Sequence, residues 1–318
     1  MGSLCDRMVI SANQETAGYL FSGQGSQYIG MGESLFQAFT ESRAVFEAAD
    51  ETLGFSLSRL CFEGPQDELT KTNNCQPAIL TVSIASFRAF QSINKDQSDK
   101  TIYAAGLSLG EYSALVAAGA ISFEDAVYLI RRRGEFMEEE ARNIPGAMAS
   151  IIGLDLDKIR QLCRESGAEI ANLNCPGQVV ISGGVKEVNE ASRIAQEAGA
   201  KRVIRLEVSG AFHSSLMKGA SLKLALELDK VKIVEPKMTV ISNVTAAPVV
   251  SPEEIKENLI KQVSSSVLWE DSIKLMLSKG VINFYEFGPG KVLKGLMRRI
   301  NEGASVVCVE KKEDLLTL

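Results

Sequence analysis

The sequence predicts an α/β protein with a small ferredoxin-like α+β subdomain inserted into it. Strand-like and helix-like segments alternate over the first part of the chain and again over the last part, as expected for a protein built on a parallel sheet. Between these parts the segments follow the order β-α-β-β-α-β, which is the split ferredoxin-like pattern. We therefore assign residues 1–16 to a flexible leader, residues 17–143 and 211–318 to the α/β core, and residues 144–210 to the subdomain.

The first part of the core is predicted from hydrophobic periodicity and from residues that begin helices. Its expected elements are a strand at 18–23, a helix at 32–53, a helix at 77–91, a strand at 101–108 and a helix at 122–142. Pro77 suits the first position of the third element. Ser122 is the expected N-cap of the last one, since acidic residues follow in its first turn.

The subdomain elements are separated by glycines and by one Pro-Gly turn. They are expected at 147–154, 155–167, 168–174, 178–184, 185–199 and 201–210, with helices in the second and fifth places. After them, the α/β alternation of the core resumes with "FHSSLMKGASLKLALEL" at 212–228.

Composition restricts the classes of function. Apolar residues make up 45% of the 318 residues and charged residues 23%, which is typical of a soluble globular protein. The net charge of −6 argues against nonspecific nucleic-acid binding. The longest apolar runs are too short to span a membrane. Six cysteines without a C-x-x-C pair, beside one histidine, argue against a zinc site and indicate reduced thiols in a cytosol-like compartment. A catalytic cysteine is the alternative, but none lies in a motif that would lower its pKa.

Ser108 is the first candidate catalytic residue. It lies in "GLSLGEYSALVAAGA" (106–120), a G-x-S-x-G pattern between a predicted strand and a predicted helix, where a sharp turn exposes a serine hydroxyl. The helix N-terminus would also direct free N–H groups at a developing oxyanion. The alternative interpretation is a structural turn serine between closely packed glycines. If Ser108 is a nucleophile with an imidazole base, the base is His213, the only histidine in the chain. A helix cap or a partly buried surface residue is the alternative for His213.

The arginines of "RRRG" (131–134) differ in their predicted exposure. The apolar face of their helix is defined by Phe123, Ala126, Val127, Ile130 and Met137. Arg133 falls on the shoulder of this face, whereas Arg132 points nearly opposite and Arg131 is expected on a solvated surface. A half-buried arginine suits a carboxylate of a substrate, and a structural salt bridge is the competing interpretation.

The glycine-rich segment "FSGQGSQYIGMG" (21–32) follows the first strand. Its glycine spacing does not match a dinucleotide-binding turn, and no P-loop lysine follows. A loop whose backbone N–H supplies a second oxyanion donor fits better.

Six motifs in this order resemble the malonyl-CoA:acyl-carrier-protein transacylases of type II fatty-acid synthesis, over nearly the whole chain from about residue 17. They are "FSGQGSQYIGMG", "GLSLGEYSALVAAG", "RRRGEFM", "NCPGQVVISGG", "GAFHSSLM" and "FYEFGPGKVLKGLMRRI". The resemblance implies a hydrolase-like α/β core, an inserted ferredoxin-like subdomain and an active site in the cleft between them.

The resemblance also implies a role for particular residues. Ser108 would be the nucleophile, His213 its base, and Arg133 the ligand of the malonyl carboxylate. The main-chain carbonyl of Gln262 would orient the histidine in place of a triad aspartate. The remaining positions are Gln24 and Leu109 for the oxyanion hole, Asn172 or Asn174 for the shape of the pocket, and Lys291, Lys294, Arg298 and Arg299 for docking an acidic carrier protein. For these four cations, a plain amphipathic surface helix is the alternative.

The implied reaction moves a malonyl group from malonyl-CoA to the phosphopantetheine thiol of acyl carrier protein through a malonyl-serine, with ping-pong kinetics and no metal or redox cofactor. Two positions depart from the usual pattern. Leu107 replaces a histidine before the nucleophile, which changes the polarity beside the serine. Phe212 replaces a serine before His213 and resembles a block against methyl-branched substrates, which favours malonyl over methylmalonyl.

Three other functions compete with this one: an acyltransferase for another extender unit, an esterase or thioesterase that transfers the acyl group to water, and a non-catalytic carrier-binding module. The retained serine, histidine and arginine argue against the last. We further expect a monomer that binds neither nucleic acid nor membrane. The lack of a Ser/Arg-rich transit segment favours a bacterial cytoplasm over a plastid stroma.

Overall fold

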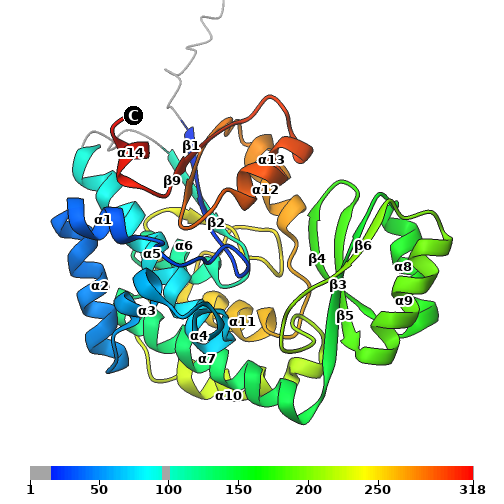
Figure 1. Cartoon of the computed structure of the whole chain (residues 1–318). Helices are drawn as coiled ribbons and strands as arrows, with labels where there is room; N and C mark the ends of the chain where they lie inside the picture. The colour runs from blue at the N-terminus through cyan, green and yellow to red at the C-terminus, as the bar shows by residue number, and fades with distance from the viewer. Residues whose placement is uncertain (1–15, 95–100, 318) are drawn as a thin grey trace, which may run out of the picture.

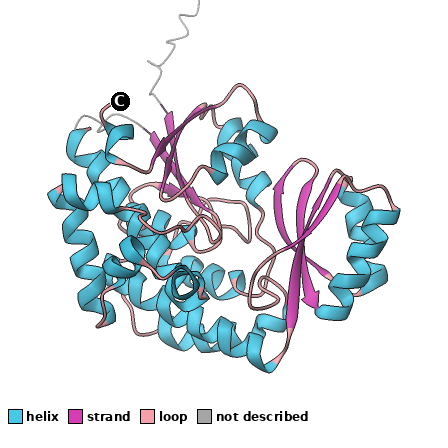
Figure 2. Cartoon of the chain, viewed as in Figure 1, coloured by secondary structure: helices cyan, strands magenta, loops and turns pink. Residues whose placement is uncertain are grey.

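Two separate β-sheets organise the chain (Figures 1 and 2). The computed structural model describes residues 16–94 and 101–317. Sheet A is parallel, has the strand order β7-β2-β1-β8-β9, and forms the core. Its strands are β1 (Thr16–Phe21), β2 (Thr101–Gly106), β7 (Thr239–Val240), β8 (Asn283–Phe287) and β9 (Ser305–Val309). The predicted leader lies outside the described residues, apart from Thr16, which begins β1.

Both faces of sheet A are buried, as a parallel sheet requires. Successive side chains of β1 alternate between the faces. Tyr19 and Phe21 pack with Phe87 and Phe287 on the side of α5 (Thr72–Ile93), whereas Leu20 faces α12 (Trp269–Ser278) and α13 (Val292–Ile300). The helices of the core are α1 (Glu33–Ala38), α2 (Thr40–Leu53), α3 (Leu57–Glu63), α4 (Gln66–Thr70), α5 (Thr72–Ile93), α6 (Gly110–Ala117), α7 (Phe123–Asn143), α10 (Lys218–Leu228), α11 (Pro252–Gln262), α12 (Trp269–Ser278), α13 (Val292–Ile300) and α14 (Lys312–Leu315), with a 3₁₀ turn at Ser215–Met217.

Sheet B is antiparallel, has the order β4-β5-β3-β6 and carries two helices on one face (Figure 1). Its elements are β3 (Gly146–Ile152), α8 (Leu156–Ser166), β4 (Glu169–Cys175), β5 (Gln178–Gly184), α9 (Val185–Glu197) and β6 (Arg202–Arg205). Ile151, Ile159 and Ile181 lie in its own small core. The predicted order β-α-β-β-α-β and the predicted fold class are confirmed, and the domain boundaries at 143/144 and 210/211 stay predictions.

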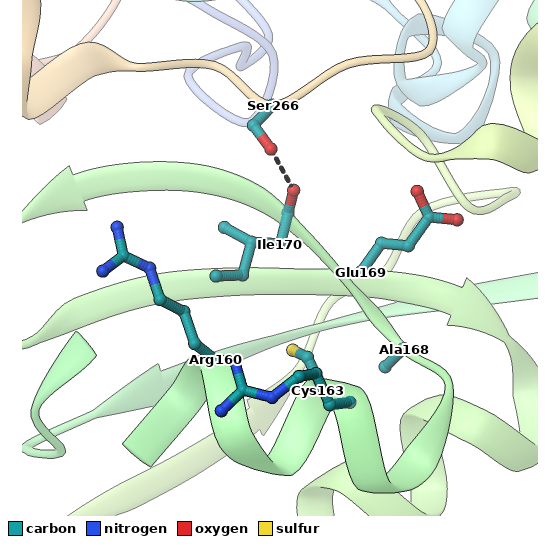
Figure 3. A pocket seen from close by; sticks show the side chains of 7 residues that line it. Arg160, Cys163, Ala168, Glu169, Ile170 and Ser266 are labelled. Carbon is teal, nitrogen blue, oxygen red and sulfur yellow. Dashed lines mark hydrogen bonds between the residues drawn. The ribbon is translucent and has the colours of Figure 1, made fainter. Parts of the chain in front are cut away.

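A segment of the core pairs with the exposed edge of β4 and joins the two sheets. The Leu173 N–H donates to Val267 O at 2.9 Å, and the Val267 N–H donates to Ala171 O at 2.8 Å. The Ser266 hydroxyl donates to Ile170 O beside a shallow pocket of about 380 Å³ (Figure 3). These bonds cover a strand edge that would otherwise be unpaired. They also fix the chain just after Gln262 against the subdomain.

Two predicted helices differ from the structure. The segment 32–53 is two helices, because Phe39 is extended at φ −125° and ψ 126°. The helix predicted at 77–91 begins five residues earlier at Thr72, so Pro77 lies inside it rather than at its first position. An internal proline leaves the carbonyl four residues before it without its helical donor. That carbonyl, of Asn73, accepts a hydrogen bond from Arg131 Nη1 at 2.9 Å.

The other boundaries agree more closely with the sequence, except that the strand predicted at 201–210 comprises only Arg202–Arg205. α7 begins after Ser122, whose hydroxyl accepts the Asp125 N–H at 3.1 Å, so this N-cap prediction is confirmed. The strand predicted at 101–108 ends at Gly106, and Ser108 lies in the turn that follows. Over the described ranges 16–94 and 101–317, no helix has both the length and the apolar character needed to cross a membrane.

The turn after β2 has no room for a side chain at Gly106. A Cβ there would lie 1.9 Å from the carbonyl oxygen of Gly110, which is backbone and cannot move aside. We expect Gly106→Ala to destabilise the protein by about 3 kcal/mol or more, in the upper range for overpacking. Urea or thermal unfolding measures the change.

Gly295→Ala is the matched control, because a Cβ at that helical position meets no heavy atom within 4 Å. It should raise stability by roughly 0.5–1 kcal/mol through helix propensity. Equal effects of the two substitutions would contradict the close packing of the turn.

Candidate active site

Ser108 lies on a sharp turn between β2 and α6. Its φ is 53°, in the left-handed region that non-glycine residues seldom adopt. The Leu107 N–H donates to Phe21 O at 3.1 Å, which ties the turn to β1. A Cβ at Gly110 would lie 2.4 Å from the same Phe21 oxygen, so the helix can begin this close to the sheet only with glycine there. The turn thus presents the serine hydroxyl at the carboxyl end of the central strands.

Asn243 holds this turn through its side-chain amide. Its Oδ1 accepts the Ser108 N–H at 2.7 Å, and its Nδ2 donates to Gly106 O at 2.8 Å. The amide therefore spans Leu107 on both sides. Asn243 is fully buried, so water does not compete for these bonds.

Ser108, His213 and Gln262 form a hydrogen-bonded chain. Ser108 Oγ lies 2.8 Å from His213 Nε2, and His213 Nδ1 lies 2.8 Å from the main-chain oxygen of Gln262. A carbonyl oxygen only accepts, so Nδ1 carries the proton and Nε2 is free to accept the serine proton. His213 also has a positive φ, 59°, and is buried. The structure therefore brings together three residues that are more than 45 positions apart in the sequence.

The imidazole is neutral at physiological pH. Burial, and secondarily the Arg133 charge, lower the pKa of His213 to about 4. A neutral imidazole can accept the serine proton. The imidazolium that forms would be opposed by Arg133 for as long as that charge has no anionic partner.

Arg133 extends from α7 directly to the Ser108 hydroxyl. Nη2 donates to Ser108 Oγ at 3.0 Å and to Gln262 Oε1 at 3.2 Å, and Nη1 donates to Gln76 Oε1 at 2.6 Å. The side chain is 1% exposed, so it is more deeply buried than the sequence predicted. Burial lowers the pKa of the guanidinium.

Within the described residues, Arg133 has no carboxylate within 4.0 Å, and its Nε has no hydrogen-bond partner. The competing interpretation of a structural salt bridge is therefore wrong. A buried cation whose hydrogen-bond acceptors are all neutral can still accept an anionic partner.

The neighbouring arginines lie outside the site. Arg132 pairs with Glu135, and its guanidinium stacks over Phe136 at 4.7 Å. Arg131 is only 23% exposed and donates to Asn73 O, so its predicted place on a solvated surface is wrong.

A cavity of about 540 Å³ opens beside Ser108. Its walls come from the core and from sheet B, and they include Gln24, Leu107, Met148, Asn172, Phe212 and His213. Phe212 is 4% exposed, so its ring is a fixed part of this wall. Asn174 does not line the cavity: it is buried and its Oδ1 has no partner among the described residues.

The two residues predicted for the oxyanion hole flank the serine. Gln24 lines the cavity, and Leu109 is the N-cap of α6. Their backbone N–H groups donate no hydrogen bond to any residue in the described part of the chain. Both are therefore free to donate to a ligand.

The four cations predicted for docking lie on or just before α13, and none lines the cavity. Lys291, Lys294 and Arg298 are exposed. Arg299 is also exposed, but it donates to Gln178 Oε1 at 2.6 Å and to Pro176 O at 3.1 Å, so it ties α13 to the β4–β5 turn.

Three residues of the network were not predicted from the sequence: Gln76, Glu111 and Asn243. Burial raises the pKa of Glu111 to about 7, and its Oε2 accepts from Gln262 Nε2 at 2.5 Å. Glu111 is the only charged residue in the stretch 106–120, which is a signal that could have indicated it. Asn243 follows β7, a neighbour of β2, and the carboxyl ends of parallel neighbours share an edge. Gln76 has no such signal.

The chain is similar to known acyltransferases over most of its length. Residues 18–301 match the family model described as acyl transferase domain. The malonyl CoA-acyl carrier protein transacylase of Bacillus subtilis (strain 168) is 49% identical over 302 residues, which cover 93% of this chain and 94% of that protein.

Two solved structures are similar over nearly their whole length. One is an acyl-carrier-protein-S-malonyltransferase from Bartonella henselae, with a TM-score of 0.91, 40% identity, and coverage of 95% of this chain and 98% of that chain. The other is a malonyl-transacylase in complex with its type II PKS acyl-carrier protein, with a TM-score of 0.90, 39% identity, and coverage of 95% and 98%.

The low pKa of His213 predicts the pH dependence of serine acylation. The base must be neutral, and it is neutral above its pKa of about 4. With p-nitrophenyl acetate, the rate of Ser108 acylation should stay constant from neutral pH to about one unit above that pKa and fall below it. Phenol release measures the rate, and circular dichroism at each pH verifies that the protein is folded.

Arg133→Ala supplies the control, because it removes one of the two causes of the low pKa. The acid limb of its profile should move to higher pH. An acid limb at the ordinary histidine pKa in both proteins would contradict the burial of a neutral His213.

Proposed function

The chain belongs to the acyl transferase domain family, and on that premise we propose that Arg133 selects a malonyl group for the reaction of this enzyme. The enzyme transfers the malonyl group from malonyl-CoA to acyl carrier protein, for fatty-acid synthesis. The supporting observation is that a fully buried guanidinium, without a carboxylate partner among the described residues, lies 3.0 Å from the nucleophile. A malonyl carboxylate would supply the missing counter-charge, and its planar oxygens match the arginine fork.

The proposed mechanism begins with attack of Ser108 Oγ on the thioester carbonyl while His213 Nε2 takes the hydroxyl proton. The oxyanion of the tetrahedral intermediate would accept from the N–H groups of Gln24 and Leu109. Collapse of the intermediate breaks the C–S bond, and the leaving CoA thiolate takes the proton from His213. A malonyl ester on Ser108 remains.

The second half of the proposed reaction reverses these steps. The phosphopantetheine thiol of the carrier gives its proton to His213 and attacks the ester carbonyl. Collapse then expels Ser108 Oγ, which recovers the proton. The sequence is ping-pong, and every bond and proton balances with the serine, the histidine and the two thiols. We accordingly propose that no metal or other cofactor takes part.

Substrate binding would also prepare the base. Arg133 opposes a positive charge on His213 in the free protein. A malonyl carboxylate bound to Arg133 offsets that charge, so the imidazolium forms more readily when the correct substrate is present. We also propose that the buried Phe212 ring in the cavity wall leaves no room for a methyl branch on the acyl chain.

For the carrier protein we propose a docking surface formed by Lys291, Lys294 and Arg298, which are exposed near the N-terminus and along α13. Carrier proteins of this kind are acidic, so cations guide the encounter despite the net charge of −6. Arg299 contributes by fixing the helix to sheet B. We propose a monomer in the bacterial cytoplasm.

Intact-mass spectrometry tests the function. The protein mixed with malonyl-CoA should gain one malonyl group, which Ser108→Ala abolishes and which acyl carrier protein removes. Transfer to water alone would indicate an esterase, and the absence of any adduct would indicate a binding module. A methylmalonyl adduct formed equally fast would indicate an enzyme for another extender unit.

Arg133→Ala tests the selection of the acyl group. Loss of a charged hydrogen-bond partner should lower kcat/KM for malonyl-enzyme formation by about 100-fold, while acetylation by acetyl-CoA should not fall. Quench-flow with mass detection compares the two substrates. A similar loss with both would mean that Arg133 supports the fold or Ser108 rather than the carboxylate.

Charge reversal tests the docking surface. The double substitution Lys294→Glu/Arg298→Glu should raise the KM for the carrier by about tenfold at low salt, and less at high salt because screening weakens the interaction. Malonyl-enzyme formation, which needs no carrier, is measured in parallel to separate the two half-reactions. Lys279→Glu changes an exposed lysine after α12 and is the control. An equal rise in the KM for the carrier with this variant would mean that the net charge of the protein, and not the proposed docking surface, causes the effect.

A further inference from the structure

Glu111 is a buried carboxylate to which the mechanism above gives no task. It lies in the first turn of α6, three residues after Ser108, and is 2% exposed. Burying a carboxylate is unfavourable unless its hydrogen bonds and charge are compensated. Here one oxygen, Oε2, accepts from the Asn243 N–H at 3.2 Å and from Gln262 Nε2 at 2.5 Å. An oxygen that accepts from two donors cannot carry the proton, so Oε2 is an acceptor whether or not Glu111 is ionised.

This acceptor fixes the orientation of the Gln262 side-chain amide. Nε2 of Gln262 donates to Glu111 Oε2 and also to the main-chain oxygen of Ser108 at 3.0 Å. Both partners only accept, so the NH₂ group must face them. The amide oxygen is then left to face Arg133 Nη2, at 3.2 Å. The reversed amide would place NH₂ against the guanidinium, donor against donor.

The orientation matters because two amide oxygens hold the arginine fork. Gln262 Oε1 accepts from Nη2, and Gln76 Oε1 accepts from Nη1 at 2.6 Å. Together they define the plane in which the guanidinium can meet a planar carboxylate. The Gln76 amide donates through Nε2 to Met137 Sδ at 3.6 Å, whereas the Gln262 amide depends on Glu111.

We propose that Glu111 is a positioning residue that aims Arg133 at the substrate carboxylate by fixing the Gln262 side-chain amide. This inference rests on the proposed function. It assigns Glu111 an effect on the choice of acyl group rather than on the serine–histidine chemistry. The main-chain oxygen of Gln262, which orients His213, is unaffected by the orientation of the side-chain amide.

The test compares malonyl-enzyme with acetyl-enzyme formation, since acetyl-CoA has the same thioester without the carboxylate. Glu111→Leu should lower the malonyl-to-acetyl ratio of kcat/KM by about tenfold, mainly through the KM for malonyl-CoA. Glu111→Gln keeps an oxygen that can accept both donors, so it should keep the ratio within about threefold.

A second substitution changes Gln262, the hydrogen-bond partner of Glu111. Gln262→Leu removes the amide, with its contacts to Arg133, Glu111 and Ser108 O, but keeps the main-chain oxygen that orients His213, and it should lower the ratio at least as much as Glu111→Leu. The double substitution should lower the ratio no further than Gln262→Leu alone, because Glu111 acts on Arg133 only through the amide that Gln262→Leu removes. If Glu111→Leu does not fold, Glu111→Gln and Gln262→Leu decide: a ratio kept by the first and lost by the second supports the proposal.

Two control variants distinguish an effect on the orientation of Arg133 from a general destabilisation of the site. Asn243→Ala releases the turn at Ser108 without a contact to Arg133, so it should lower both rates together. Glu286→Leu removes a different buried carboxylate, which accepts the Leu293 and Lys294 N–H groups, and should leave the ratio unchanged.

Several results would overturn the proposal. If Glu111→Leu lowered kcat/KM equally for malonyl-CoA and acetyl-CoA, Glu111 would have only a structural role. A ratio lost in Glu111→Gln would show that the charge, and not the accepting oxygen, is what matters. A wild-type protein that forms no malonyl-enzyme would overturn the proposed function and this inference with it, and that result is recognised before any variant is made.

Discussion

The buried charge of Arg133, which has no carboxylate in direct contact among the described residues, is the constraint around which the site is built. Its guanidinium is 1% exposed and is held by two glutamine oxygens and the nucleophile hydroxyl, none of which carries a charge. Such a cation is tolerated only because every neighbour is fixed in place. The energy that a direct carboxylate partner would have supplied is left for a ligand. The proposed selectivity for an anionic acyl group therefore rests on the lack of a carboxylate beside Arg133 among the described residues, rather than on the shape of the cavity.

The reactive groups also lie on strained backbone. Ser108 and His213 both have positive φ, where a non-glycine residue is unfavourable, and the structure around each must compensate. At Ser108 the compensation is the Asn243 amide and the packing of the turn against β1. At His213 it is the bond from Nδ1 to Gln262 O. The same contacts that offset the backbone strain also hold the Ser108 hydroxyl 2.8 Å from the His213 imidazole. The hydrogen bonds that stabilise the strained backbone therefore also position the two side chains.

The sequence indicates the reactive atoms better than it indicates their support. Ser108 is found from its place between a strand and a helix, and His213 from being the only histidine. Arg133 is found from helical periodicity, although its depth is underestimated because that depth depends on α5 packing against α7. Gln76 reaches the site only through contacts between distant segments, which no local pattern encodes, and the one signal for Asn243 is its place after a strand that neighbours β2. The position of Pro77 is predicted wrongly for the same reason. The carbonyl that Pro77 leaves without a helical donor accepts a hydrogen bond from Arg131, which lies on another helix.

The subdomain is part of the site rather than an attachment to it. Met148 on β3 and Asn172 on β4 line the cavity, so without sheet B the acyl group would lie open to water. The pairing of Val267 with β4 fixes that wall to the segment that follows Gln262. Because Gln262 contacts His213 through its main-chain oxygen and Arg133 through its side-chain oxygen, any shift of sheet B against the core would disturb both of these residues together. The proposed chemistry therefore requires that sheet B and the core be held rigidly together where Val267 pairs with β4.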